Sequence, residues 1–183
     1  MVKTRAGLGP DRMMYGGIKT KQKIGMDKIF DKFFDEEKFD TIIEIGTLPG
    51  GFALYLATKA IEIEAEFYTF DIKQPSGKRD FINKINKLNA KFIKQNVLKG
   101  KTISKLIKKE GRVLILNDGE KIHAFKKFAP ELKKNDYIFT HDYTGDREFE
   151  WQLSDIQETI DKHNLKIIYK EFESYFWLCC VKQ

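Results

Sequence analysis

The chain has 183 residues, and its 33 Lys and Arg residues against 27 Asp and Glu residues give a formal net charge of +6. This length suits one packed domain, and two adjacent cysteines, Cys179 and Cys180, are too few for a disulfide framework. No apolar run approaches the roughly 20 residues that span a bilayer, and the first residues lack the apolar core of a secretory signal. We therefore expect a soluble, cytoplasmic protein with no membrane partner.

The positive charge is concentrated at the start of the chain. Residues 1–24 hold six Lys and Arg residues against Asp11 alone, so this segment carries +5 of the net +6. Pro10 and several glycines in the same segment suit an irregular backbone. We therefore expect a flexible basic arm or lid at 1–24, attached to a nearly neutral domain at 25–183. The arm offers one route to nucleic acid, but the nearly neutral domain disfavours a nucleic-acid-binding protein.

The predicted elements alternate between helices and strands from residue 26 onward. Ile and Phe side chains at helical spacing predict a helix that begins at Met26. A run rich in β-branched residues predicts a buried strand at 41–45, and Ala and Leu favour a helix at 52–61. The alternation then continues with strands at 67–70 and 91–94 and with helices at 78–88 and 102–109.

The second half of the chain continues this alternation and then ends in a different pattern. Further strands are expected at 113–116 and 137–140, and further helices at 120–132 and 150–162. Two β-rich runs at 165–169 and 175–181 are joined by so few residues that they must pair antiparallel. The sequence thus predicts an α/β fold with a single doubly wound, Rossmann-like sheet. This sheet has seven strands, mostly parallel, and ends in a C-terminal antiparallel β-hairpin.

Candidate binding residues lie where the predicted strands end, because doubly wound sheets bind ligands beyond the carboxyl ends of their strands. Gly46, Gly50 and Gly51 follow the strand at 41–45 and allow the backbone to approach a ligand. Leu48 breaks the G-x-G-x-x-G spacing, which disfavours NAD and FAD. Asp71 ends the next strand, where an acid can accept hydrogen bonds from both hydroxyls of a ribose.

A second group of polar residues follows the strands at 113–116 and 137–140. Asp118 comes after the first of these strands, and His141 and Asp142 come after the second. Carboxylate oxygens suit Mg²⁺, which would lower the pKa of a bound substrate hydroxyl. The sequence leaves three roles open for His141: general base, metal ligand, or a side chain without chemistry.

The glycine turn with an acid at the end of the next strand resembles the class I S-adenosylmethionine-dependent methyltransferases. Short stretches look more narrowly like the cephalosporin hydroxylase-like and related small-molecule O-methyltransferases, namely residues 17–19, 43–53, 116–119, 130–132 and 137–142. The resemblance implies an enzyme that transfers a methyl group from S-adenosylmethionine to a small hydroxylated acceptor. An RNA or protein methyltransferase of the same fold and a non-catalytic S-adenosylmethionine-binding module are the alternatives.

The resemblance also implies roles for individual residues. Those implied to bind the cofactor are Glu44, Gly46, Thr47, Gly50, Gly51, Asp71, Asn96 and Asp118. In the metal-dependent members, acids at the ends of the same two strands hold the ion, so Asp118, His141 and Asp142 are the implied metal-binding and catalytic residues. The chain departs from that branch at Glu120-Lys121 and at His141, and a bound Mg²⁺ is therefore left open.

Overall fold

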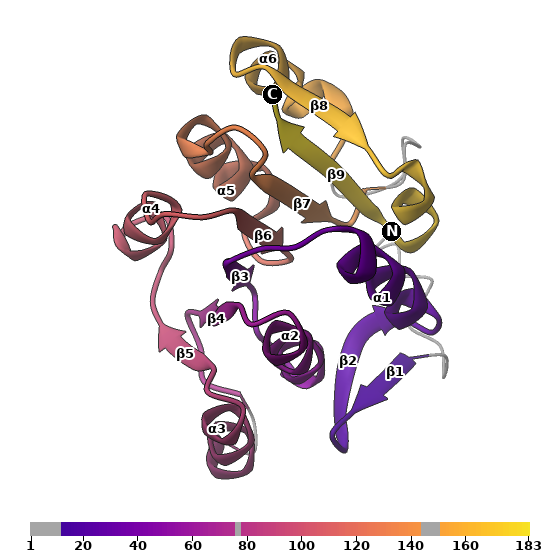
Figure 1. Ribbon diagram of the computed structural model, residues 1–183, viewed down its shortest axis with the longest axis vertical. Helices are drawn as coiled ribbons and strands as arrows, with labels where there is room; N and C mark the ends of the chain where they lie inside the picture. The colour runs from indigo at the N-terminus through magenta and orange to yellow at the C-terminus, as the bar shows by residue number, and fades with distance from the viewer. Residues whose placement is uncertain (1–11, 76–77, 144–150) are drawn as a thin grey trace, which may run out of the picture.

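The computed structural model describes residues 12–75, 78–143 and 151–183. A sheet of seven strands runs through the molecule, with helices on both sides (Figure 1). The strands are β3 (Thr41–Ile45), β4 (Glu66–Asp71), β5 (Lys91–Lys94), β6 (Val113–Asn117), β7 (Tyr137–His141), β8 (Leu165–Ile168) and β9 (Trp177–Lys182). Their order across the sheet is β5-β4-β3-β6-β7-β9-β8.

The helices form one layer on each face of the sheet. One layer contains α1 (Met26–Glu36), α2 (Gly51–Glu62) and α3 (Lys78–Lys87), and the other contains α4 (Thr102–Ile107), α5 (Lys121–Phe128) and α6 (Gln157–Lys162). Alternate strand residues point to opposite faces, so Ile42 packs in the core under α1 and α2 while Ile43 packs in the core under α4 and α5. Each strand therefore supplies two hydrophobic cores.

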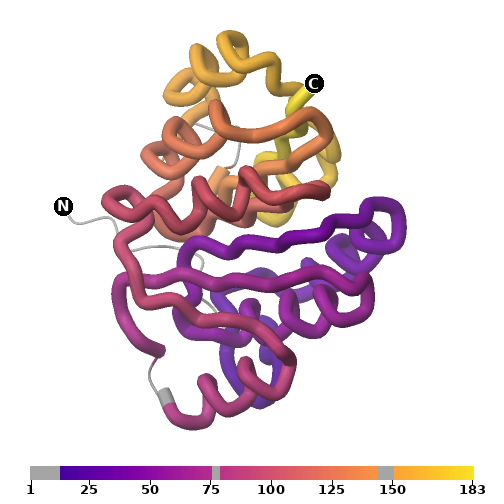
Figure 2. The backbone as a smooth tube through the Cα atoms, turned by 60° about the vertical axis from the view of Figure 1, so that its left-hand side comes forward, coloured from indigo at the N-terminus to yellow at the C-terminus, as the bar shows by residue number. Residues whose placement is uncertain are grey.

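The pairing of the strands confirms the predicted fold class. β3 pairs parallel with both β4 and β6, and β6 pairs parallel with β7. β9 lies between β7 and β8 and runs antiparallel to both, which is the predicted C-terminal hairpin. The chain moves outward from β3 to β5 and then returns to β6, so its first and second halves occupy opposite ends of the molecule in Figure 2. The order reverses between β3 and β6, where doubly wound sheets bind ligands.

The start of the chain differs from the predicted flexible arm. β1 (Arg12–Tyr15) and β2 (Ile18–Lys23) form an antiparallel hairpin, here called the N-terminal hairpin, and it packs against α2. Thr20 and Gln22 are buried on one face of β2, while Lys19, Lys21 and Lys23 are exposed on the other. The segment is therefore a half-buried strand whose lysines lie on the solvent side. Residues 1–11 of the predicted arm lie outside the described residues.

Four predicted helices are shorter than expected: those at 78–88 and 102–109 end one and two residues early, and two others are divided between α-helix and 3-10 helix. The helix expected at 120–132 ends at Phe128 and continues as the 3-10 helix η1 (Ala129–Glu131), because Pro130 cannot donate a helical hydrogen bond. The helix expected at 150–162 consists of the 3-10 helix η2 (Leu153–Asp155) and α6. A third 3-10 helix, η3 (Lys170–Tyr175), connects β8 to β9. Within the described ranges, no helix is long and apolar enough to cross a membrane.

Candidate functional site at the carboxyl ends of the strands

The loop that follows β3 touches the loop that follows β6. Gly46 has a φ of +101°, and a Cβ at this position would lie 2.8 Å from the backbone nitrogen of Gly119. The N–H of Gly46 donates to the carbonyl of Phe70, and the N–H of Asp118 donates to the carbonyl of Ile45, both at 2.8 Å. Position 46 therefore requires glycine, and the ends of β3, β4 and β6 are joined through the backbone.

The helix that follows this loop begins against the N-terminal hairpin. Gly50 is the N-cap of α2, with a φ of +112°, and a Cβ there would lie 2.8 Å from the ring of Phe81. A Cβ on Gly51 would collide with the carbonyl oxygen of Ile18 and would lie 2.7 Å from that of Lys19. We expected Gly51 to make room for a ligand; in the structure, the backbone of β2 fills that room.

Glu44 is buried in β3 and belongs to a short chain of polar groups. The hydroxyl of Thr69 donates to Glu44 Oε2 at 2.5 Å, and Thr47 Oγ1 lies 2.5 Å from Thr69 Oγ1. Burial raises the pKa of Glu44 to about 8, against the lowering effect of the Thr69 hydrogen bond, and the negative charges of Asp118 and Asp71 add to the rise. The Glu44 carboxyl is therefore protonated at neutral pH.

Asp71 and Asn96 follow neighbouring strands but differ in what their side chains contact. Asp71 Oδ2 accepts the backbone N–H of Leu48 in the glycine loop at 3.2 Å, and its Oδ1 accepts the N–H of Lys73 at 2.9 Å. Asp71 is thus held beside the loop that follows β3. Asn96 is exposed, and its side-chain oxygen accepts the N–H of Leu98 in its own turn at 2.9 Å.

The structure brings Asp118, His141 and Asp142, here called the trio, into one cluster. Each offers a ligand atom that lies within 4.8 Å of the other two. His141 Nδ1 lies 2.9 Å from Asp118 Oδ1 and 3.2 Å from Asp142 Oδ1. Neither oxygen lies where Nδ1 could donate to it, so this buried nitrogen makes no hydrogen bond to the part of the chain that the structure describes. The proximity expected from parallel pairing of β6 and β7 is confirmed.

The charges of the trio depend on one another. Burial alone would lower the pKa of His141, but the carboxylates of Asp118 and Asp142 outweigh it and raise this pKa to about 9. Burial would raise the pKa of Asp142, but His141 and Lys121 hold it well below its usual range. Without an ion, the two carboxylates therefore favour the protonated imidazole, and the three roles that the sequence left open for His141 stay predictions.

Two further side chains contact the trio from outside. Gln22 Nε2 donates to Asp118 Oδ2 at 3.0 Å, and Lys121 Nζ lies 2.7 Å from Asp142 Oδ2. The sequence interpretation named Lys121 only as a departure from a family pattern and did not single out Gln22. The alternation of charged and uncharged residues at 19–23 was the signal that could have placed Gln22 on the buried face of a strand.

The trio has the donor set of a divalent-cation site. Asp118 Oδ1, Asp142 Oδ1 and His141 Nδ1 face one another. Gln22 contacts the outer oxygen of Asp118, and Lys121 contacts the outer oxygen of Asp142 while its ammonium also lies 3.9 Å from Asp118 Oδ1. The two carboxylate oxygens suit Mg²⁺ or Mn²⁺, whereas the imidazole nitrogen is a softer ligand that favours a transition metal over Mg²⁺. The buried Nδ1 of His141 has no hydrogen bond within the described residues. When a metal ion binds, this nitrogen would release its proton and take the ion as its partner. These residues therefore fit a divalent ion.

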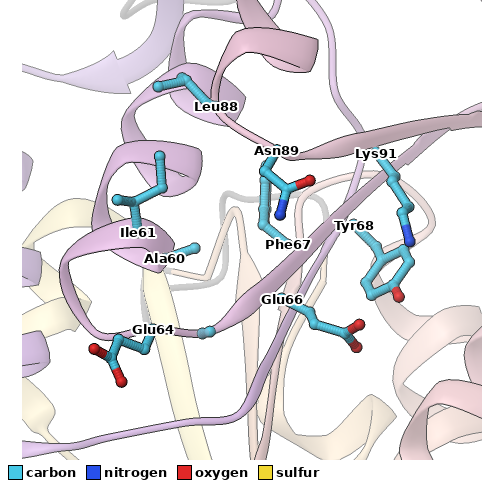
Figure 3. Close-up of a pocket in the computed structure, with 10 residues that line it drawn as sticks. Ala60, Ile61, Glu64, Glu66, Phe67, Tyr68, Leu88, Asn89 and Lys91 are labelled. Atoms are coloured by element: carbon cyan, nitrogen blue, oxygen red, sulfur yellow. The ribbon is translucent and has the colours of Figure 1, made fainter.

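A separate pocket of about 270 Å³ lies where β4 and β5 begin, and Figure 3 shows the residues that line it. Glu66 and Lys91, which begin β4 and β5, line it together with Glu64, Tyr68 and Asn89. The Lys91 ammonium lies over the Tyr68 ring, 5.2 Å from its centroid. Because the trio follows the carboxyl ends of β6 and β7, this pocket does not belong to the candidate site.

The fold is shared with several solved structures. A structure of CmcI with Mg and SAM is 14% identical in sequence, with a TM-score of 0.68, and the match covers 99% of this chain and 82% of that one. The TDP-rhamnose 3′-O-methyltransferase CalS11 is 11% identical, with a TM-score of 0.61 over 87% of this chain and 77% of that one. An O-methyltransferase from Bacillus cereus in complex with SAH is 15% identical, with a TM-score of 0.60 over 88% and 82% of the two chains.

Sequence comparison adds no relative to these. No protein-family model matches the chain, and no curated protein matches it in sequence. The likeness is therefore one of fold, and in this chain that fold is a Rossmann-like, mostly parallel sheet of seven strands that ends in antiparallel strands.

Proposed function

We propose that the chain is an S-adenosylmethionine-dependent methyltransferase that acts on a hydroxyl group of a small molecule. One observation carries the proposal: the glycine loop, Asp71 and the trio all follow carboxyl ends of strands around the point where the strand order reverses. The fold neighbours named with SAM or SAH support this choice of cofactor. The neighbours named as O-methyltransferases support the hydroxyl acceptor.

The residues proposed to hold the cofactor surround the loop after β3. Asp71 is proposed to accept hydrogen bonds from the ribose, because its carboxylate is already oriented by the N–H groups of Leu48 and Lys73 and has further acceptor capacity. The other proposed cofactor residues are Glu44, Gly46, Thr47, Gly50, Gly51, Asn96 and Asp118. Phe81 fills the space beside the α-carbon of Gly50, and the backbone of β2 fills the space beside that of Gly51. These two glycines are therefore proposed to contact the cofactor through their backbone groups.

The trio is proposed to prepare the acceptor. When bound, S-adenosylmethionine supplies an electrophilic methyl group, so the protein has to position the acceptor oxygen and assist the loss of its proton. Asp118, His141 and Asp142 would hold a divalent ion, which supplies the positive charge that lowers the pKa of a hydroxyl group. Lys121 and Gln22 hold the two carboxylates from outside, and the trio is thus ordered before the acceptor arrives.

Titration with S-adenosylhomocysteine in a calorimeter tests the cofactor assignment. We expect Asp71→Asn to weaken the affinity about tenfold or more, because the variant loses charged hydrogen bonds to the ribose. Glu158→Gln, which changes an exposed acid on α6, should leave the affinity unchanged. Equal affinity of the wild type and Asp71→Asn would contradict the ribose assignment, and no binding to the wild type would contradict the function itself.

Transfer is tested separately, with tritium-labelled S-adenosylmethionine and a panel of small hydroxylated compounds. Label in a compound supports the proposed enzyme. Tight binding of the cofactor with no transfer to any compound, RNA or protein would favour the alternative of a non-catalytic binding module.

A further inference from the structure

The N-terminal hairpin places one buried side chain against the trio. Gln22, on β2, is only 1% exposed. Its Nε2 donates to Asp118 Oδ2 at 3.0 Å, and its Oε1 accepts the indole N–H of Trp177 at 3.2 Å. Asp118 follows β6 and Trp177 begins β9, so a single amide connects three elements that are far apart in sequence.

The direction of these hydrogen bonds is set by their chemistry. An indole N–H can only donate, so the amide oxygen of Gln22 has to face Trp177. The NH₂ group then faces Asp118, and because it can only donate, Asp118 Oδ2 has to accept. The arrangement therefore fixes which oxygen of Asp118 points outward.

Trp177 is a firm support for this amide. Its ring is fully buried and packs edge-on against Phe30, with 6.0 Å between centroids. It also lies 6.1 Å from the ring of Phe52, and its N–H contacts Met26 Sδ at 3.1 Å. The indole is thus held in place by its own packing. Its hydrogen bond fixes the Gln22 amide, and the Gln22 amide in turn orients the carboxylate of Asp118.

The effect on Asp118 matches what a metal site requires. With Oδ2 held by Gln22, Asp118 Oδ1 faces His141 Nδ1 at 2.9 Å. Lys121 contacts Asp142 Oδ2, and Asp142 Oδ1 lies 3.2 Å from the same nitrogen. The Lys121 ammonium also lies 3.9 Å from Asp118 Oδ1. Each carboxylate therefore has one oxygen held from outside and one directed into the trio.

We propose that Gln22 is a positioning residue, which orients Asp118 so that the trio is preset to bind a divalent cation. The inference rests on the proposed function, because the trio is the metal site of that proposal. Groups that hydrogen-bond to metal ligands orient them, and their loss weakens metal affinity about 10- to 100-fold. The N-terminal hairpin is thereby part of the site and not only a cover for α2.

Binding of Mn²⁺ alone, followed by electron paramagnetic resonance, tests the proposal. Gln22→Met keeps the length and volume of the side chain but removes the donor to Asp118, and we expect its Mn²⁺ affinity to fall about 10- to 100-fold. Thr20→Val is the matched control, because Thr20 is buried on the same face of β2 and its hydroxyl accepts the N–H of Gln22 at 3.0 Å. This control removes a hydrogen bond of the hairpin backbone but keeps the side-chain amide of Gln22. Its Mn²⁺ affinity should stay within about twofold of that of the wild type.

S-adenosylhomocysteine affinity is measured by calorimetry on the same variants. In Gln22→Met it should fall by less than the Mn²⁺ affinity, because Asp118 is only one of the proposed cofactor residues, and in Thr20→Val it should be unchanged. Wild-type Mn²⁺ affinity in Gln22→Met would overturn the proposal, as would an equal loss in Thr20→Val or a parallel loss of S-adenosylhomocysteine binding. A wild type that binds S-adenosylhomocysteine but no Mn²⁺ would also overturn it, while leaving the proposed cofactor in place.

A second measurement uses the wild type alone and does not depend on the folding of a variant. The side-chain amide resonances of Gln22 in an NMR spectrum should shift on titration with Mg²⁺, because the amide donates to a carboxylate that binds the ion. Resonances that stay in place while the ion binds would overturn the proposal.

Discussion

Gly46 and Gly17 both have a backbone conformation that favours glycine, but they differ in their surroundings. Their φ angles are +101° and +77°. A Cβ at Gly46 would meet the backbone of Gly119 at 2.8 Å, whereas a Cβ at Gly17 would have no atom of the described chain within 4 Å. A side chain at Gly17 would therefore strain only the backbone conformation. A side chain at Gly46 would also disturb the contact between the loops that follow β3 and β6.

Alanine substitutions at the two positions should differ in stability. We expect Gly17→Ala to lower the free energy of unfolding by about 1 kcal/mol, the cost of the left-handed conformation alone. Gly46→Ala should lower it by roughly 2 to 4 kcal/mol, because two backbones have to separate as well. Urea denaturation of the two variants measures both values, and equal losses would show that the contact at Gly46 is unimportant.

Most of the sheet could be predicted at the level of its elements, because a buried parallel strand has a strong local signal. β-branched residues in the run that ends at Gly46 gave the bounds of β3 without error, and those of β5 were also correct. The N-terminal hairpin has a weaker local signal, the alternation of charged and uncharged residues at 19–23. Two strands are marginal by themselves, and this hairpin depends on α2, where Gly51 leaves space for its backbone.

The residues of the candidate site also differ in how far they could be predicted from the sequence. Asp118, His141 and Asp142 could be grouped from sequence, because adjacent parallel strands bring their carboxyl ends together; their roles remain predictions. Gln22 could not be assigned to this group, because its contacts to Asp118 and Trp177 are tertiary and no local pattern encodes them.

Trypsin distinguishes a packed hairpin from a flexible arm. Lys19, Lys21 and Lys23 are exposed, but their backbone belongs to a paired strand that packs on α2. We expect native protein to resist cleavage after these three lysines, and unfolded protein to be cut there rapidly. Mass spectrometry of a digestion time course identifies the sites, and rapid cleavage after Lys21 in the native protein would restore the flexible-arm interpretation.

For the molecule as a whole, the net charge has a defined position. Four of the basic residues that account for the +6 lie on the N-terminal hairpin, at 12, 19, 21 and 23. The lysines among them are exposed on β2, on the face opposite Gln22. Much of the excess charge therefore belongs to a folded, exposed surface of β2 that faces away from Gln22.

Glu37 joins distant parts of the chain and makes stability depend on pH. Its carboxylate accepts hydrogen bonds from Arg112 Nη2 and the Tyr137 hydroxyl, both at 2.8 Å, and from the Tyr169 hydroxyl at 3.0 Å. Burial alone would raise the pKa of Glu37, but these partners outweigh it and lower the pKa below its ordinary value near 4.5. The ionised form thus stabilises the fold. This contribution is complete above the unfolded pKa and is lost as pH falls through the folded one.

Glu37→Gln should lower the free energy of unfolding by about 1 to 2 kcal/mol at pH 7, because it weakens charged hydrogen bonds. The difference from the wild type should shrink as pH falls below the ordinary pKa of glutamate. Glu36→Gln is the matched control, since Glu36 forms an exposed pair with Lys32 at 3.7 Å and such pairs contribute little. Denaturation curves at several pH values test this, and a pH-independent difference would contradict the role of the Glu37 charge.

The bond between Gln22 and Trp177 spans 155 positions and constrains the order of folding. During synthesis, the N-terminal hairpin and α2 leave the ribosome long before residue 177, and the early chain can form only their mutual contacts. Asp118 acquires its complete support once β9 has entered the sheet between β7 and β8. The support that Trp177 gives to Asp118 through Gln22 is therefore completed late, and a nascent chain that has not yet formed β9 lacks it.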